Sequence, residues 1–220
     1  MLEARRQFHN DLEVLQQDLL RMGALVEESI FKAVRVLTEQ NKELAQEVIR
    51  GDDLIDQMEI DLETRSLSLI ALQQPLASDL RILGTVLKAV TDLERMADHS
   101  VDMAKIILQM ESQPWIKPLI DIPRMAKLVE GMVRNGLTAF IRRDVAMAES
   151  LAELDDQVDT LYRQIFQELL VLMISTPSSV QQATLLLLAA QNLERIGDHA
   201  TNIGEWVIYM VEGVRRDLNT

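Results

Sequence analysis

The sequence contains no cysteine, and this absence excludes disulfide bonds and thiolate-bound metals. It has only 8 glycines and 5 prolines, and aromatic residues make up 4% of the chain. Leucine, alanine, methionine, glutamate and glutamine dominate instead. These residues favour helices because their side chains lose little rotamer freedom there. Since no segment alternates apolar and polar residues as a strand does, the sequence predicts an all-α protein.

Long apolar runs and basic clusters are also missing. No purely apolar stretch, including Leu185–Ala190, exceeds six residues, and the first arginines have no apolar run behind them, unlike a signal peptide. The longest basic run is Arg142-Arg143, and the net charge of −13 argues against nucleic acid and anionic lipid as direct partners. We therefore expect a cytoplasmic protein without direct membrane insertion, whose partners are cations or basic protein surfaces.

The chain is a tandem repeat. A shift of 103 residues carries the acidic pair Asp52 and Asp56 onto Asp155 and Asp159. Further along the chain the offset is 100, and "DLERMADHSVDM" in the first half matches "NLERIGDHATNI" in the second. The shared order of these motifs predicts two copies of one structural unit.

Each copy has the pattern of three helices. We expect them over residues 3–45, 52–74 and 78–110 in the first copy, and over 124–150, 154–175 and 179–215 in the second. Gly51 and Asp52 indicate a helix break with an N-cap. Ser78 is a second expected N-cap, and Ser178 with Gln181, or Ser179 with Gln182, forms a capping-box pattern.

Three prolines in "SQPWIKPLIDIP" indicate a linker between the two copies. The predicted architecture is a tandem pair of pseudo-symmetric three-helix bundles. The first bundle covers residues 1–113, the linker covers 114–123 and the second bundle covers 124–220.

The third helix of each copy carries two rows of side chains. One row belongs to the core stripe and consists mainly of small residues, which let a neighbouring helix approach closely: Leu93, Ala97, Ser100 and Ala104, matched by Leu193, Gly197, Ala200 and Gly204. The other row starts at the core edge and turns toward solvent: Glu94, Asp98 and Asp102, matched by Glu194, Asp198 and Asn202.

These polar rows are candidate metal ligands. If Asp52 and Asp56 meet Glu94 and Asp98 in the folded bundle, a hard cation would offset the repulsion among four carboxylates. Oxygen ligands suit Mg²⁺, Mn²⁺, Ca²⁺ or iron, whereas zinc prefers Cys and His. The alternative is a solvated acidic face, with Arg95 paired to Asp98 and an equivalent pair in the second copy.

The histidines and the missing catalytic motifs limit the chemistry further. His99 and His199 follow an aspartate by one position and leave the face of the acidic row, which favours a packing role over metal ligation. There is no P-loop and no nucleophile elbow, and no Glu-x-x-His pair that would suit a di-iron centre. We therefore expect a protein that is not an enzyme. A metal-dependent phosphohydrolase with a two-metal site is the alternative.

The segments "QQPLASDLR", "DLERMADHSVDM" and "NLERIGDHATNIGE" resemble the signature segments of the PhoU family of bacterial phosphate regulators. The resemblance covers nearly the whole chain and implies two three-helix bundles. It also implies bound metal ions, which could be iron, magnesium, manganese or zinc. The implied ligands are Glu94, Asp98, Asp52 and Asp56 in the first copy and Glu194, Asp198, Asp155 and Asp159 in the second, with Asp102 and Asn202 as additions.

The resemblance further implies the biology. Family members are thought to couple a phosphate ABC transporter to a sensor histidine kinase and to repress the phosphate-starvation response when phosphate is plentiful. The partners would be the transporter ATPase and the kinase, which would recruit the protein to the inner face of the membrane. Homodimers also occur in the family. A PhoU-like regulator of a different transporter is a further alternative.

Overall fold

The computed structural model describes residues 2–110 and 113–218, with side chains from residue 5 onward in these ranges. The described part contains six long α-helices, one short α-helix and one 3-10 turn, and no strand. The elements are α1 (Leu2–Glu39), α2 (Lys42–Gln73), α3 (Ala77–Gln109), α4 (Asp121–Arg142), α5 (Val145–Glu149), α6 (Leu151–Ser175), η1 (Pro177–Ser179) and α7 (Val180–Glu212). The expected all-α class is confirmed.

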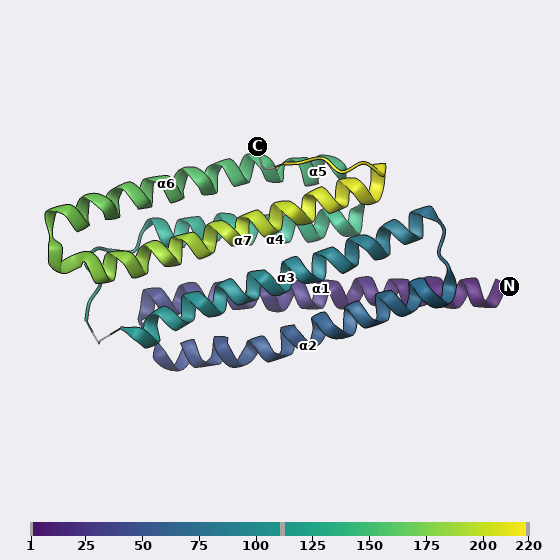
Figure 1. Ribbon diagram of the computed structural model, residues 1–220, viewed down its shortest axis with the longest axis horizontal. Helices are drawn as coiled ribbons and strands as arrows, with labels where there is room; N and C mark the ends of the chain where they lie inside the picture. The colour runs from purple at the N-terminus through teal and green to yellow at the C-terminus, as the bar shows by residue number, and fades with distance from the viewer. Residues whose placement is uncertain (1, 111–112, 219–220) are drawn as a thin grey trace.

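The helices form two bundles that lie side by side. Figure 1 shows α3 and α7 crossing the centre, with α2 beyond α3 and α6 beyond α7, while α1 and α4 lie behind them. In the first bundle α1, α2 and α3 pack on one another, and in the second α7 packs on α4, α5 and α6. The bundles join along two contacts, α3 with α7 and α1 with α4. The expected pair of three-helix repeats is confirmed. The ends of the predicted ranges, at residues 1 and 220, lie outside the described residues.

One apolar core runs through both repeats. On α3 the fully buried residues Leu83, Val86 and Val90 recur at the helical spacing, and their counterparts on α7 are buried as well. The segment between the repeats is tied to both of them, because Trp115 donates its indole N–H to the Leu37 carbonyl at 2.8 Å and Ile116 N–H donates to Gln182 Oε1 at 2.9 Å. Among the described helices, none combines the length and apolarity needed to cross a bilayer.

The expected break at Gly51 and Asp52 is wrong, because both residues lie inside α2. The chain turns earlier, at Gln40, which has a left-handed φ of 50°, and at Asn41, whose side chain accepts from Leu44 N–H at 2.9 Å. A glycine within a helix costs about 1 kcal/mol. Burying one apolar side chain on α2 contributes about 1.5–3 kcal/mol, so the helix continues through Gly51.

The second repeat turns at the equivalent positions, 103 residues later. Arg143 has a φ of 53°, and Asp144 caps α5 by accepting from Met147 N–H at 3.0 Å. The helix start expected at Leu154 is therefore also wrong. A single break at Ser150 separates α5 from α6, so these two helices together correspond to α2.

Two expected helix caps are also wrong. Leu76, not Ser78, is the N-cap of α3, and it makes no side-chain cap hydrogen bond. Ser179 precedes α7, but its hydroxyl donates to the carbonyls of Leu172 and Thr176, so it does not form a capping box. The hydroxyl instead ties the start of α7 to the end of α6.

The row of small residues packs closely, as expected. A Cβ placed on Gly204 would lie 2.7 Å from Leu151 Cδ1 and 3.1 Å from the Ala148 carbonyl oxygen, so this position has no room for a side chain. A Cβ on Gly197 would lie 3.5 Å from Asp155 Oδ1. The glycines therefore bring α7 against α5 and α6, directly beside one of the candidate metal ligands.

Candidate metal centres

In the first repeat, carboxylates of α2 and α3 face one another. Burial, followed by the charges of Asp56 and Asp98, raises the pKa of Asp52 to about 6. Burial, followed by the charges of Asp98 and Glu59, raises the pKa of Glu94 to about 7. The charges on the middle helix and on the third helix therefore act on one another, and a cation common to both stays a prediction.

The second repeat reproduces this arrangement between α6 and α7. Burial, followed by the charges of Asp198 and Asp159, raises the pKa of Asp155 to about 6. Burial and the charges of Glu194 and Asp159 likewise raise the pKa of Asp198 to about 6. The pKa of Glu194 is raised too, first by burial and then by Asp159. The chain thus carries two acidic clusters at equivalent positions.

Three oxygens of these clusters are buried without a hydrogen-bond partner in the described structure: Asp52 Oδ1, Glu94 Oε2 and Asp155 Oδ1. Glu94 Oε2 lies 3.3 Å from Arg95 Nε, close enough for an ion pair but without hydrogen-bond geometry. An unsatisfied buried acceptor costs about 1–3 kcal/mol, and more when it is charged. A cation between the helices would remove this cost, so the donor set fits a hard metal ion.

The clusters are not assembled around an ion as they stand. Among the described side chains, no three Asp, Glu or His groups are close enough to hold one ion together. The side chain of Asp98 is 43% exposed and pairs with Arg95 at 3.1 Å, and Asp56 is exposed as well. Both carboxylates are accessible to solvent, and a common cation would require them to reorient.

The Arg95–Asp98 pair is the ion pair expected for a solvated acidic face, and it is present. The equivalent Arg195–Asp198 pair is absent from the ion pairs of the described residues, although the Arg195 charge still acts on the pKa of Asp198. Arg95 therefore partly neutralises the first cluster, at Asp98 and at Glu94, whereas Asp52 Oδ1 has no such partner among the described residues.

His99 and His199 lie at the contact between α3 and α7. His99 Nδ1 is 3.0 Å from Asn192 Oδ1, and His199 Nδ1 is 2.9 Å from Asp92 Oδ1. The two imidazole rings have centroids 5.7 Å apart. Their Nδ1 atoms contact the opposite repeat, in agreement with a packing role.

A sequence profile of the PhoU domain matches residues 19–107 and matches again over residues 122–207. The chain belongs to the PhoU family. It is 41% identical over 216 residues to a phosphate-specific transport system accessory protein PhoU homolog of Clostridium acetobutylicum, covering 98% of this chain and 99% of the relative. A homolog of the same name from Aquifex aeolicus is 41% identical over 203 residues, covering 92% of each chain.

Solved structures agree with the family assignment. The crystal structure of PhoU from Pseudomonas aeruginosa has a TM-score of 0.90 and 37% identity, and the match covers 94% of this chain and 100% of that one. The phosphate transport system regulatory protein PhoU from Streptococcus pneumoniae has a TM-score of 0.89 and 33% identity, with 96% and 99% of the two chains covered. The PhoU fold therefore extends over both repeats.

Two of the predicted metal ligands, Asp102 and Asn202, make other contacts. The Asp102 side chain is 54% exposed and pairs with Lys105 Nζ at 3.1 Å. Asn202 donates its side-chain amide to Asp92 Oδ1 at 3.2 Å, across the contact between repeats. Asp102 therefore faces solvent, as expected for the end of its row, whereas Asn202 is half-buried at the contact between the repeats.

One acidic residue of the first cluster was not predicted. Glu59 lies seven residues after Asp52 on the same face of α2, and its charge raises the pKa of Glu94. The helical spacing of three and four from Asp52 through Asp56 would have identified it. At the equivalent position the second repeat has Tyr162, whose pKa is raised first by burial and then by Glu194.

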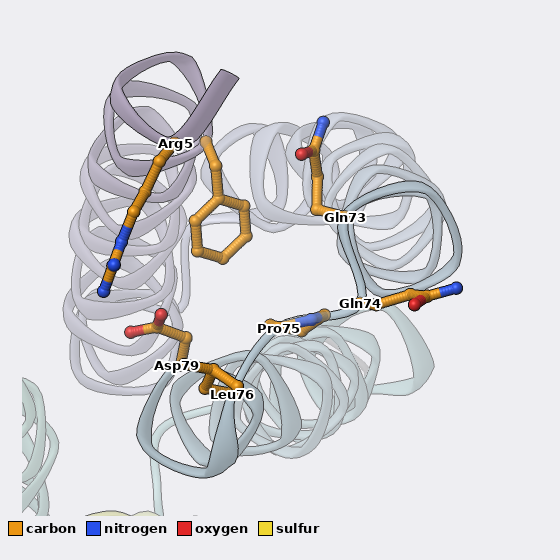
Figure 2. Close-up of a pocket in the computed structure, with 7 residues that line it drawn as sticks. Arg5, Gln73, Gln74, Pro75, Leu76 and Asp79 are labelled. Atoms are coloured by element: carbon orange, nitrogen blue, oxygen red, sulfur yellow. The ribbon is translucent and has the colours of Figure 1, made fainter. Parts of the chain in front are cut away.

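The PhoU signature segment "QQPLASDLR" lines a separate cavity of about 390 Å³ at the end of the first bundle. Its walls are Arg5, Phe8, Gln73, Gln74, Pro75, Leu76 and Asp79. Figure 2 shows Arg5 and Asp79 on one side of this cavity and the side chain of Gln74 directed away from it. At 1.5 Å per residue, Gln73 lies about 30 Å along α2 from Asp52, so the cavity is separate from the carboxylate clusters.

Proposed function

We propose that this chain regulates phosphate uptake and phosphate signalling as an adaptor between a phosphate ABC transporter and a sensor histidine kinase. It would contact the transporter ATPase and a cytoplasmic domain of the kinase, and would repress the phosphate-starvation response when phosphate is plentiful. The observation that carries this proposal is the match to phosphate-specific transport accessory proteins over 98% of the chain. The site of action is the cytoplasm, at the inner face of the membrane where these partners lie, and a homodimer is compatible with this role.

We further propose that each repeat binds metal ions, with iron, manganese, magnesium and zinc as candidates. The proposed ligands are the facing carboxylates: Glu94, Asp98, Asp52 and Asp56 in the first repeat, and Glu194, Asp198, Asp155 and Asp159 in the second. The buried oxygens without hydrogen-bond partners and the raised carboxylate pKa values support this part of the proposal. Asp102 and Asn202 are the outermost candidates.

A bound cation would hold the helices of each repeat together. Cations stabilise the ionised carboxylates, so the ion would draw α2 onto α3 and α6 onto α7. The metal would thereby set the shape of the helical face that carries the acidic rows. In this proposal the ion is structural, and the adaptor needs no reaction of its own.

A deletion strain tests the adaptor role. Without the gene, phosphate-starvation reporters are expected to be expressed in high phosphate, and the wild-type gene supplied in trans should silence them. Silent reporters together with normal phosphate uptake in the deletion strain would reject the proposal. Normal phosphate control combined with altered uptake of another substrate would identify a regulator of a different transporter.

A phosphatase assay separates the adaptor from a metal-dependent phosphohydrolase. Protein loaded with Mg²⁺, Mn²⁺ or Fe²⁺ is expected to hydrolyse p-nitrophenyl phosphate no faster than the Glu94→Ala/Asp98→Ala variant does. Metal-dependent turnover that this variant loses would establish the hydrolase in place of the adaptor.

A further inference from the structure

The two repeats are joined by polar bonds that cross from α3 to α7 beside the acidic rows. Asp92 Oδ1 on α3 contacts His199 Nδ1 at 2.9 Å and Asn202 Nδ2 at 3.2 Å, both on α7. A carboxylate oxygen only accepts hydrogen bonds, so His199 donates from Nδ1 and Asn202 donates from its amide. One carboxylate of the first repeat therefore holds two side chains of the second.

Both contacts lie within one helical turn on the C-terminal side of a candidate metal ligand, Asp198. His199 directly follows Asp198, and Asn202 is four residues beyond Asp198, about one helical turn away. Asp92 thus restrains the rotation of α7 about its own axis over the turn that carries Asp198. The side chain of Asp92 is 13% exposed, so solvent screens these bonds only weakly.

The reciprocal contact is weaker. The Asn192 side-chain amide donates to the Leu188 carbonyl at 3.0 Å, which turns Asn192 Oδ1 toward His99 Nδ1 at 3.0 Å. His99 directly follows Asp98. Asn192 therefore restrains the first repeat through a single bond to a neutral amide, because Asp102, the counterpart of Asn202, pairs with Lys105.

We propose that Asp92 and Asn192 are positioning residues that act across the repeat boundary, Asp92 for the acidic cluster of the second repeat and Asn192 for that of the first. The inference rests on the metal-binding part of the proposed function. It predicts a crossed effect: a substitution in one repeat weakens metal binding in the other. It also predicts an asymmetry, since Asp92 makes two bonds from a charged group.

The required precision explains why such bonds matter. A carboxylate on a helix lies roughly 6 Å from the helix axis, so a rotation of about 10° moves it by about 1 Å. Metal–ligand distances tolerate only about 0.2 Å. A small loss of rotational restraint on α7 therefore moves Asp198 out of range of an ion that the other ligands hold.

Titration with Mn²⁺, followed by the electron paramagnetic resonance signal of the free ion, tests the proposal in single-site backgrounds. Glu94→Gln/Asp98→Asn leaves only the second-repeat cluster, and Glu194→Gln/Asp198→Asn leaves only the first. Asp92→Ala is expected to raise the Kd of the second-repeat cluster about tenfold, at the lower end of the effects of ligand-orienting residues. Asn192→Ala is expected to raise the Kd of the first-repeat cluster by about threefold, because a neutral bond is weaker than a charge-assisted one.

Two matched variants separate positioning from general packing. Asp92→Asn keeps an acceptor oxygen in place and is expected to restore most of the affinity that Asp92→Ala loses. Thr85→Val removes another α3–α7 hydrogen bond, from Thr85 Oγ1 to the Trp206 carbonyl at 3.2 Å, and is expected to leave both Kd values within about twofold. Thr85 is seven residues from Asp92, about 10 Å along α3.

The outcomes are distinct. If Asp92→Ala weakens the second-repeat cluster no more than Thr85→Val does, or weakens the first-repeat cluster equally, the crossed positioning role is refuted while the metal proposal stands. If the single-site parents bind no Mn²⁺, the metal proposal and this inference both fail. Should Asp92→Ala not fold, Asp92→Ser, whose shorter hydroxyl cannot span the contact, carries the same expectation and the same refutation.

Discussion

Replacement of Glu94 by glutamine should stabilise the metal-free protein above neutral pH. The pKa of this carboxyl is about 7 in the folded chain against an ordinary value of 4.5, so an unfolded chain loses the proton at lower pH than the folded one does. Below pH 4.5 both states hold the proton and the raised pKa costs nothing. Between pH 4.5 and 7 the unfolded chain ionises while folded Glu94 keeps its proton, so the folded state loses stability across this window, and the full penalty is present above pH 7.

The size of the penalty follows from the same values. The difference between the folded pKa of about 7 and the ordinary pKa of 4.5 corresponds to about 3 kcal/mol, at about 1.36 kcal/mol per unit of pKa. Solvent reaches this cluster, and the Arg95 guanidinium offsets part of the charge, so we reduce the expected gain to about 1–2 kcal/mol. The Glu94→Gln variant should therefore unfold at higher urea concentration than the wild type at pH 8, and at nearly the same concentration at pH 4.5.

Urea denaturation in the presence of EDTA at both pH values measures this effect. Glu13→Gln, which neutralises an exposed carboxylate on α1, serves as the matched control and should change stability little at either pH. A Glu94→Gln variant that is no more stable than the wild type at pH 8, or that gains as much stability at pH 4.5, would contradict this prediction. Either result would show that the cluster is not under electrostatic strain.

Three further predictions follow from the packing and the charges. Gly204→Ala should lower the free energy of unfolding by about 1–3 kcal/mol because its Cβ would lie 2.7 Å from a leucine methyl. Gly51→Ala has open space around it and should stabilise α2 by about 0.5–1 kcal/mol. Urea unfolding compares the two variants, and equal effects would contradict the packing described. Glu205 is 3% exposed and accepts hydrogen bonds from Arg215 at 2.9 Å and from Leu218 N–H at 3.0 Å. Glu205→Ala should therefore lower the free energy of unfolding by about 1–3 kcal/mol and expose residues 214–218 to limited proteolysis, and unchanged cleavage would contradict this anchoring. Mn²⁺ at a hundred times its Kd should add about 2.7 kcal/mol to the unfolding free energy for each occupied cluster, and an unfolding temperature that Mn²⁺ and EDTA leave unchanged would contradict metal binding.

The sequence predicts the repeats well because the signals that specify them are local and repeated. Leu83, Val86 and Val90 mark the buried face of α3 by spacing alone, and the same spacing recurs on α7. The facing of the acidic pairs was a conditional expectation, since it depends on how the middle helix passes the third. α2 does pack on α3, and the charges of Asp56 and Asp98 both act on the pKa of Asp52, but no three acidic side chains of the described residues are close enough to hold one ion, so the shared cation site stays a prediction.

The helix boundaries were harder to predict because tertiary packing outweighs local propensity. Gly51 is a strong local signal for a helix break, yet α2 passes through it. The actual turn places Gln40 in a left-handed conformation, which a glutamine does not predict. The contacts between the two repeats are equally hard to predict from the sequence. In the sequence Asn202 is only the counterpart of Asp102 and a candidate ligand, and only the fold shows that its amide donates a hydrogen bond to Asp92.

Anomalous diffraction from crystals of protein purified without chelator, and loaded separately with iron, manganese or zinc, shows whether metal ions bind at the two acidic clusters. We expect anomalous peaks between α2 and α3, bounded by Glu94 and Asp52, and between α6 and α7, bounded by Asp198 and Asp155, with elemental analysis identifying the bound ion. Protein that carries no metal at either cluster under every loading condition would contradict this expectation.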